Sequence, residues 1–440
     1  MEEFSGGLHH RTPTIERRMR DSLTGIYNRD GFVRHVNEKV LGEGVENHVM
    51  VVMNVRNFKM INYLFGIQKG DEVLKNIAEI LYQRACEYDE ICSRFHADRF
   101  AMFMKRDTWD TYPFEETVAK IESLIDSSVY HLDVIVGVYH IRNTEDSVFD
   151  MMDKAILAMK LQRSSSGTSF HFYSENMLNK LKHREEVIAE FDDALKNDEF
   201  ILFLQPQFTV NGELVGTEAL ARWNRRNTGE ILPPSRFIDV LEATKRIHRL
   251  DQYIWELAAK QLHAWKNTKF KDVSISVNIS PEDFECISVD TFFIDLVQRY
   301  EIDPKQLRIE ITENAIISSP VKFENFINNM KEHGFIVELD DFGSGYSSLN
   351  VLKNINVDTI KLDMVFVRGL KNDARAQIIL ESIIHMIHAL GMKIIVEGLE
   401  TRGQLETIQS MGNVVYQGYY FSKPLQVSAF EDKYGEKING

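Results

Sequence analysis

Leu307–Asn314 reads LRIEITEN, a short apolar run that ends in acidic and amide residues, and Ile336–Gly343, IVELDDFG, repeats this pattern. Six further runs of the same kind lie between residues 200 and 422: FILFLQP, LVGTEALARW, VSISVNIS, TIKLD, KIIVEGLE and VYQGYYFS. Helical patterns separate most of these runs. Eight strands in roughly 250 residues match the strand count and size of a (β/α)₈ barrel, so the sequence predicts an α/β, TIM-type barrel over residues 198–435.

Almost every predicted strand carries a charged or carboxamide residue at or near its C-terminal end: Gln205, Glu218, Asn278, Glu310, Asp340 with Asp341, Lys361, Glu397 and Gln417. In a barrel these ends converge on one face, where the active sites of this fold are built. Buried carboxylates are costly unless they are paired or bind a cation, and oxygen ligands favour Mg²⁺ or Mn²⁺ over zinc. One such acid alone is typical of a solvated loop, but the whole set predicts a metal site.

The first half has a different pattern, in which apolar runs such as HVMVVMNV from His48 and LDVIVGVYHI from Leu132 alternate with helical stretches. This pattern predicts a compact α/β domain of about 150 residues. Between the halves, apolar residues from Met177 to Leu195 recur at helical spacing, which favours one amphipathic helix. We therefore expect an N-terminal tail over residues 1–20, a first domain over 21–173, a connector helix over 174–197 and the barrel over 198–435.

The composition excludes several classes of protein. The chain has 440 residues and a formal net charge of −15, which argues against a duplex-DNA binder because such a protein needs a basic face. No run of eighteen apolar residues is present and the N-terminus carries no secretion signal, so we expect no membrane segment and no export. Three scattered cysteines are too few for a disulfide framework or a zinc site. These features predict a cytoplasmic protein.

Seven motifs of the second half resemble the EAL family of phosphodiesterases, which open cyclic di-GMP: EALARW, SVNIS, EITEN, DDFGSGYSSL, KLD, EGLE and QGYYFSKP. They occur in the family's order and spread across the whole segment. The resemblance implies a metal-dependent hydrolase that forms linear pGpG and assembles as a homodimer through this domain. Two departures, Leu204 for the family's tyrosine and Val414 for its acid, leave the expected metal ligands unchanged.

The same resemblance implies a role for individual residues. One metal ion, Mg²⁺ or Mn²⁺, would be held by Glu218, Asn278, Glu310 and Asp340, and a second by Asp340, Asp341 and Glu397. Lys361 would contact the attacking water, while Gln205, Arg222 and Gln417 would contact the substrate or lie beside it. Glu313 would brace the DDFGSGYSSL loop, which in the family links metal binding to the dimer interface. The residues expected to support catalysis are thus Lys361, Glu218, Asp340, Asp341 and Glu313.

The first half resembles a GGDEF domain, the diguanylate cyclase family, through DSLTGIYNR from Asp21 and NFKMINYLFGIQKGDEVL from Asn57. This implies a nucleotide-cyclase-like α/β fold over roughly residues 15–172. The positions that carry the chemistry have changed. His96 and Ala97 stand where the family has two glycines, and Arg99 replaces the acid that follows Asp98.

Further changes affect the metal and product sites of this half. Asn54 replaces a metal-binding aspartate, and Glu87 and Glu90 stand where the family's inhibitory product site needs arginine and aspartate. We therefore expect no synthesis of cyclic di-GMP and describe this domain as degenerate.

Most of the family's nucleotide recognition set is nevertheless retained. Asn62 and Asp71 fall where the family reads the guanine edge, Lys160 falls where it contacts phosphate, and Asp98 keeps a metal-binding acid. Two interpretations remain open. In one, the domain binds GTP without converting it and regulates the barrel. In the other, the domain is only a folding and dimerisation scaffold.

For the whole chain, the leading hypothesis is a cyclic di-GMP phosphodiesterase that uses two divalent ions. The alternative is a non-catalytic cyclic di-GMP receptor that signals through its dimer. Receptors of that type usually lack several metal ligands, whereas all the expected ligands are present here. A bifunctional enzyme with residual cyclase activity is a third hypothesis, against which Asn54, His96 and Ala97 argue.

Overall fold

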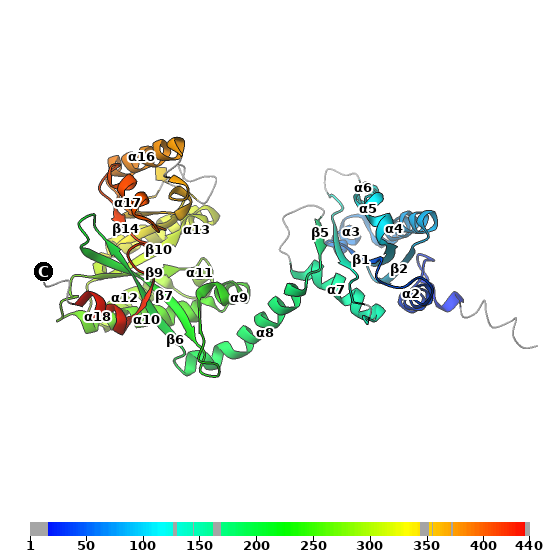
Figure 1. The fold of residues 1–440 in the computed structure, drawn as a ribbon, viewed down its shortest axis with the longest axis horizontal. Coiled ribbons are helices and arrows are strands. Elements are labelled where there is room, and N and C mark those ends of the chain that lie inside the picture. The colour runs from blue at the N-terminus through cyan, green and yellow to red at the C-terminus, as the bar shows by residue number, and fades with distance from the viewer. Residues whose placement is uncertain are drawn as a thin grey trace, which may run out of the picture. The chain divides into compact units, whose positions relative to one another are not determined.

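The computed structural model describes residues 16–125, 130–143, 145–161, 169–343, 352–353, 355–370 and 373–435. The chain divides into two compact units, Met1–His183 and Arg184–Gly440. Each unit combines helices with a sheet of its own (Figure 1). The α/β class predicted for both halves is therefore confirmed.

The first unit is built on a five-stranded sheet in the order β2-β3-β1-β4-β5. Its strands are β1 (His48–Val55), β2 (Ile91–His96), β3 (Arg99–Lys105), β4 (Val134–His140) and β5 (Ser169–Phe172). Its helices are α2 (Arg29–Glu43), α3 (Phe58–Phe65), α4 (Ile67–Tyr88), α5 (Arg106–Thr111), α6 (Phe114–Glu122) and α7 (Val148–Leu161). The β4–β5 pair is parallel, and the other three pairs are antiparallel.

The central strand β1 is buried on both faces, as its uninterrupted apolar run predicts. Val49, Val51 and Met53 pack with α3, α4 and α6 in one apolar cluster. Met50 and Val52 belong to a second cluster, which contains apolar residues of α2 and α7. The sheet therefore separates two cores, one on each face.

The second unit closes eight strands into a barrel in the order β6-β14-β13-β12-β11-β10-β9-β7, and pairing between β6 and β7 completes the ring. These strands are β6 (Phe200–Phe208), β7 (Leu214–Asn224), β9 (Ser274–Ile279), β10 (Leu307–Thr312), β11 (Val337–Phe342), β12 (Thr359–Leu362), β13 (Lys393–Val396) and β14 (Val415–Tyr416). Two short strands, β8 (Ile231–Leu232) and β15 (Leu425–Gln426), pair with β7 and β6. Each of the eight predicted runs contains one barrel strand, so the predicted barrel is confirmed.

Helix α8 (Glu175–Lys196) crosses the boundary between the two units, and its second half is fixed to the barrel because Arg225 Nη2 lies 2.6 Å from Glu190 Oε2. The α-helices that follow are α9 (Ile238–Ala243), α10 (Ile247–Trp265), α11 (Asp283–Cys286), α12 (Val289–Arg299), α13 (Glu313–Ser318), α14 (Pro320–Glu332), α16 (Ala374–Ala389), α17 (Arg402–Gln409) and α18 (Val427–Gly435). Three 3₁₀ turns are η1 (Pro234–Arg236), η2 (Pro304–Gln306) and η3 (Met364–Phe366).

The barrel differs from a regular (β/α)₈ barrel in the direction of its first strand. β6 runs antiparallel to both of its barrel neighbours, β7 and β14, whereas the pairs from β7 round to β14 are parallel. The physical reason is the connection between β6 and β7, residues 209–213, which is too short for the crossover that parallel strands require. Gln205 consequently lies within β6, opposite Glu218, and not at the end of a parallel strand.

We predict that Gly137→Ala destabilises the first unit. A Cβ at position 137 would lie 2.0 Å from the carbonyl oxygen of Ala155 and 2.7 Å from Met159 Cγ, both on α7. Because the nearest atom is backbone, β4 and α7 must separate, and we expect the free energy of unfolding to fall by about 1–3 kcal/mol. Native-state hydrogen exchange of the β1 and β4 amides, read by mass spectrometry, measures this loss.

Gly70→Ala is the matched control. Its Cβ would also meet an oxygen, at 1.9 Å, but that atom is the side-chain Oδ1 of Asn62, which can rotate away. Exchange in β1 and β4 should therefore change little. Equal losses in the two variants would contradict the close packing of β4 on α7.

Candidate active site

The polar residues predicted at the strand ends largely come together in the barrel. A cavity of about 380 Å³ opens there, and seven of the predicted residues line it: Gln205, Glu218, Asp340, Asp341, Lys361, Glu397 and Gln417. Further lining residues include Met364, Glu400 and Tyr419, which the sequence analysis did not single out. The strands that carry the seven residues run from β6 to β14 around the barrel. The cavity therefore depends on closure of the barrel.

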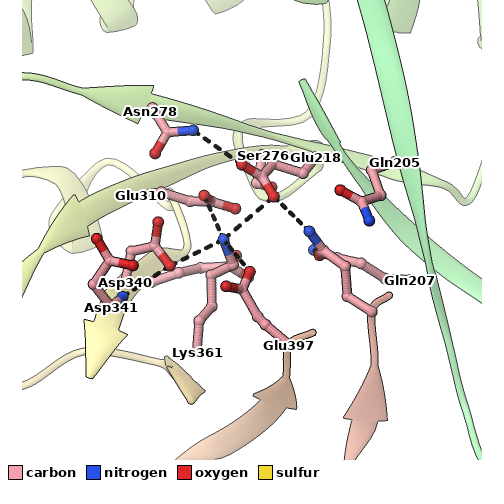
Figure 2. A network of polar contacts seen from close by, with 12 residues as sticks. Gln205, Gln207, Glu218, Ser276, Asn278, Glu310, Asp340, Asp341, Lys361 and Glu397 are labelled. Atoms are coloured by element: carbon pink, nitrogen blue, oxygen red, sulfur yellow. Dashed lines mark hydrogen bonds and ion pairs between the residues drawn. The ribbon is translucent and has the colours of Figure 1, made fainter. Parts of the chain in front are cut away.

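The ammonium group of Lys361 lies at the centre of this site, among four carboxylates (Figure 2). Its Nζ is 2.7 Å from Glu310, 2.8 Å from Glu397, 3.1 Å from Asp340 and 3.5 Å from Glu218. Burial alone would lower the pKa of Lys361, but the attraction of these carboxylates outweighs it and holds the pKa well above its usual value. The lysine is therefore a permanent cation at the centre of the site.

One ammonium group does not balance the acids around it. Burial, together with repulsion from the neighbouring Asp340, raises the pKa of Asp341 to about 6. The same two causes outweigh the attraction of Lys361 and raise the pKa of Glu397 to about 8. Burial also raises the pKa of Glu310, whose Oε1 atom is buried without a hydrogen-bond partner. These are the features of a site that is short of positive charge.

The donor set fits divalent cations in its chemistry. Five carboxylates and the carboxamide of Asn278 supply hard oxygen donors, which suit Mg²⁺ or Mn²⁺. Within the described residues, no three acidic, histidine or cysteine side chains already surround one point as metal ligands would. The carboxylates lie around Lys361 instead, so the fit rests on ligand type, excess negative charge and the unpartnered oxygen of Glu310.

Two consecutive aspartates reach the same cavity because the backbone of β11 is irregular. Neighbouring side chains of a regular strand point to opposite faces. Here the register of β11 against β12 shifts between Leu339 and Phe342, and Asp341 adopts a left-handed backbone with φ of 55°. The Asp341 amide also donates to Asp340 Oδ1 at 2.9 Å. This bulge brings both carboxylates to the site, at a cost in backbone strain that is common at functional sites.

A chain of side-chain amides orients Glu218. The Nε2 group of Gln207 donates to Gln417 Oε1 at 2.9 Å, and Gln417 Nε2 donates to Glu218 Oε2 at 2.5 Å. Asn278 Nδ2 donates to the other oxygen of Glu218 at 3.1 Å. The sequence analysis missed Gln207, although its spacing of two from Gln205 already placed both residues on one face of the strand.

The remaining predicted residues of the barrel lie around the cavity. Glu313 is fully buried and its Oε2 accepts the Gly343 amide at 2.9 Å, while residues 344–350 of the DDFGSGYSSL loop lie outside the described residues. Arg222 is half-buried, with its guanidinium 5.3 Å from the centre of the Phe203 ring, and is not among the residues that line the cavity. Burial lowers the pKa of Arg222.

A second ion pair lies on β10 and β11, two residues before the carboxylates that these strands bring to the cavity. Arg308 and Glu338 precede Glu310 and Asp340 by two residues, so each points to the same face as its neighbour. Arg308 Nη1 lies 3.1 Å from Glu338 Oε1, and the Glu338 side chain is fully buried. Burial raises the pKa of Glu338, and Arg308 opposes that shift. The sequence analysis did not identify this pair.

The nucleotide-binding residues expected in the first unit are not joined by hydrogen bonds or ion pairs to one another. Asn62 on α3 and Asp71 on α4 are half-buried, and Lys160 on α7 is exposed. Asn62 Oδ1 is buried without a hydrogen-bond partner. Asp98 lies in the turn between β2 and β3, where its carbonyl accepts the Val55 amide at 3.4 Å.

The turn that replaces the expected glycines keeps a glycine-like backbone. Ala97 has φ of 52°, a value that a Cβ disfavours. Arg94 stabilises it, because its Nε donates to the Ala97 carbonyl at 2.7 Å and its Nη1 pairs with Asp21 at 2.9 Å. The changed residues therefore alter the surface of this turn more than its path.

Comparison with known proteins finds two family models. One described as "EAL domain" matches residues 188–424, and one described as "Diguanylate cyclase, GGDEF domain" matches residues 18–167. The EAL match covers more than half of the chain. In the described part of the chain, no helix has both the length and the apolar character needed to cross a membrane.

Two relatives come from Pseudomonas aeruginosa. The chain is 27% identical over 422 residues to "Cyclic di-GMP phosphodiesterase NbdA", covering 94% of this chain and 53% of NbdA. It is 24% identical over 420 residues to "Bifunctional diguanylate cyclase/cyclic di-GMP phosphodiesterase MucR", covering 93% of this chain and 61% of MucR. The chain spans about half to two thirds of the length of the curated relatives with which it is compared.

A solved structure is also similar to part of the chain. It is described as "PaMucR Phosphodiesterase, c-di-GMP complex" and is 27% identical to this chain, with a TM-score of 0.53. The similarity covers 56% of this chain and 99% of that structure.

We predict that Glu338→Gln destabilises the barrel strongly. The substitution keeps the side-chain volume but leaves the Arg308 guanidinium, which is 17% exposed, without its counter-charge. Loss of one partner of a buried pair costs about 3–5 kcal/mol, and the partial exposure of Arg308 favours the lower end. Urea denaturation followed by tryptophan fluorescence measures this loss in the free energy of unfolding, because Trp223, Trp255 and Trp265 are all buried in the barrel.

Glu406→Gln provides the control for this measurement. Glu406 also pairs with an arginine, Arg402, at 2.8 Å, but the two side chains are 60% and 80% exposed. An exposed pair contributes about 1 kcal/mol or less. Similar losses in both variants would show that burial does not determine the contribution of the Arg308–Glu338 pair.

Proposed function

Because the chain belongs to the EAL domain family, we propose that it hydrolyses cyclic di-GMP to linear pGpG at the cavity around Lys361. One observation carries this proposal: four carboxylates from different strands lie within 3.5 Å of a single buried ammonium group. The similarity to the cyclic di-GMP phosphodiesterase NbdA and to the MucR phosphodiesterase in complex with c-di-GMP supports the choice of substrate. Hydrolysis of a phosphodiester needs a site that gathers cations beside an activated water, and an excess of buried carboxylates provides for this.

We further propose that the site uses two divalent ions, Mg²⁺ or Mn²⁺. Glu218, Asn278, Glu310 and Asp340 would hold one ion, and Asp340, Asp341 and Glu397 the other. When bound, the two ions supply Lewis acidity that polarises the scissile phosphate and lowers the pKa of the attacking water. Asp340 belongs to both sets, which is consistent with its position beside the bulge that brings Asp341 to the cavity.

The protein's own residues provide position and charge. Lys361 is held protonated by its carboxylate neighbours, so it stabilises negative charge that develops on the phosphate in the transition state. Gln417 and Gln207 hold Glu218 in one orientation through their hydrogen bonds. Glu313 fixes the backbone at Gly343, two residues after Asp341. Gln205, Arg222 and Gln417 are proposed to contact the substrate.

For the first unit, we propose a degenerate cyclase domain that binds GTP without converting it. The unpartnered Oδ1 of Asn62 supports a role in hydrogen bonding to a ligand. Asn54 directs its amide to the Val55 carbonyl at 3.1 Å and supplies no carboxylate, which argues against a cyclase metal site. The homodimer through the EAL domain and the cytoplasmic location remain predictions.

Glu218→Gln should abolish hydrolysis of cyclic di-GMP. It removes a negative charge from the proposed metal ligands and keeps the side-chain shape, so we expect a loss of roughly a hundredfold or more in rate. Purified protein is incubated with cyclic di-GMP, with Mg²⁺ or with EDTA, and the products are separated by chromatography. EDTA should have the same effect on the wild type.

Glu213→Gln is the control, since Glu213 is exposed and directly precedes the same strand, β7. It should hydrolyse cyclic di-GMP at the wild-type rate. A Glu218→Gln variant that retained wild-type turnover would refute the assignment. Tight binding of cyclic di-GMP by the wild type without any pGpG would instead favour the non-catalytic receptor.

Lys361→Ala should lower kcat with little change in KM. The ammonium group lies among the carboxylates, so its charge is expected to act mainly when negative charge develops in the transition state. Steady-state kinetics at saturating Mg²⁺ separates the two parameters. A raised KM with unchanged kcat would mean that Lys361 only binds substrate.

A further inference from the structure

The first unit contains a cavity that the proposed function does not use. It has a volume of about 330 Å³ and lies between the start of α2, the β2–β3 hairpin and α7. Its apolar floor is formed by Phe95, Met152 and Ile156. All three belong to the apolar cluster on the α2 and α7 face of the sheet or pack against it.

This cavity is on the other face of the sheet from the expected guanine-binding residues. Neither Asn62 nor Asp71 lines it. Their helices, α3 and α4, pack apolar residues such as Ile61 and Leu74 into the opposite cluster. Lys160 and Asp98 do not line the cavity either. A base bound here would therefore lie on the other face of the sheet from the residues expected to bind the guanine of GTP.

The rim of the cavity is basic, although the chain as a whole carries a net charge of −15. Arg29, His96 and Arg99 face a single acid, Asp153, around the opening. In the part of the chain that the structure describes, neither Arg29 nor Arg99 has an ion-pair partner. His96 and Arg99 are cross-strand partners in the hairpin, so their side chains extend from the same face. Unpaired guanidinium groups on one rim are suited to bind a phosphate.

The rim also carries an aromatic surface. Phe149 is 44% exposed, and the guanidinium of Arg29 lies 4.9 Å from the centre of its ring. An exposed phenyl ring beside a planar cation offers a stacking surface for a flat heterocycle. A volume of about 330 Å³ is at the lower end for ligand pockets and suits one nucleotide better than two.

From these features we propose that this cavity binds a purine nucleoside monophosphate. The base stacks against Phe149 and Arg29, and the phosphate binds between Arg99, His96 and Arg29. The apolar floor excludes water from beneath the base. Two of the three positions at which the hairpin differs from the GGDEF pattern, His96 and Arg99, thus supply the phosphate contacts.

Titration calorimetry with GMP on the full chain tests the proposal, in EDTA so that metal-assisted binding at the barrel is suppressed. Binding should occur in the wild type and weaken by about tenfold or more in Arg29→Ala and in Arg99→Glu, since each loses a hydrogen bond to a charged group. Arg34→Ala is the matched control, because Arg34 lies on the same helix α2 in an exposed pair with Glu38. It should bind GMP like the wild type.

Three further measurements distinguish binding at this cavity from binding elsewhere on the chain. The double variant Asn62→Ala with Asp71→Ala should keep its affinity for GMP, whereas loss of binding there would place GMP in the guanine site. Guanosine and inorganic phosphate should each bind at least tenfold more weakly than GMP, because each lacks half of the proposed contacts. Phosphate binding as tight as that of GMP, unchanged binding in Arg99→Glu, or absence of heat with the wild type would each overturn the proposal.

Discussion

The ion pairs of Lys361 are the interaction on which the barrel site depends. Charges inside a protein are costly unless they are paired, and here the barrel brings five carboxylates to one interior face. A single ammonium group contacts four of them and balances part of their charge. The negative charge that it leaves uncompensated is also what makes the cavity suitable for cations.

The other polar contacts of the barrel follow from this constraint. Gln417 donates a hydrogen bond to the Glu218 carboxylate and is itself held by a hydrogen bond from Gln207. Arg308 and Glu338 form a separate pair two residues earlier on the same strands, in which Arg308 offsets the charge of a further buried acid. The site therefore has two layers of charge, spaced two residues apart along β10 and β11, and each layer contains a cation that pairs with acids across the strands.

The sequence was sufficient to predict the barrel and most of the residues that line its cavity, because strand ends in this fold converge whatever lies between them. The sequence was less informative where a contact depends on the direction of a strand or on an irregular backbone conformation. The antiparallel course of β6 follows from a five-residue connection that was present in the sequence but was not used. The left-handed backbone of Asp341 has no such signal, because nothing in the sequence distinguishes Asp341 from the preceding Asp340, and the shift in strand register appears only once β11 is paired with β12. In the sequence, Arg308 and Glu338 look like ordinary surface charges, because their contact becomes visible only when the pairing of the two strands is known.

The direction of β6 also determines where the connector meets the barrel. Phe200, the first residue of β6, pairs with Trp223 near the C-terminal end of β7, so the chain enters at the rim that bears the site. An ion pair with Arg225 holds helix α8 against the barrel. The helix ends at Lys196, a short stretch of chain before Gln205. In mechanical terms the connector acts as a lever with two arms: a twist of α8 would act on the strand that carries Gln205 and Gln207 and, through the ion pair of Asp192 with Arg249, on helix α10.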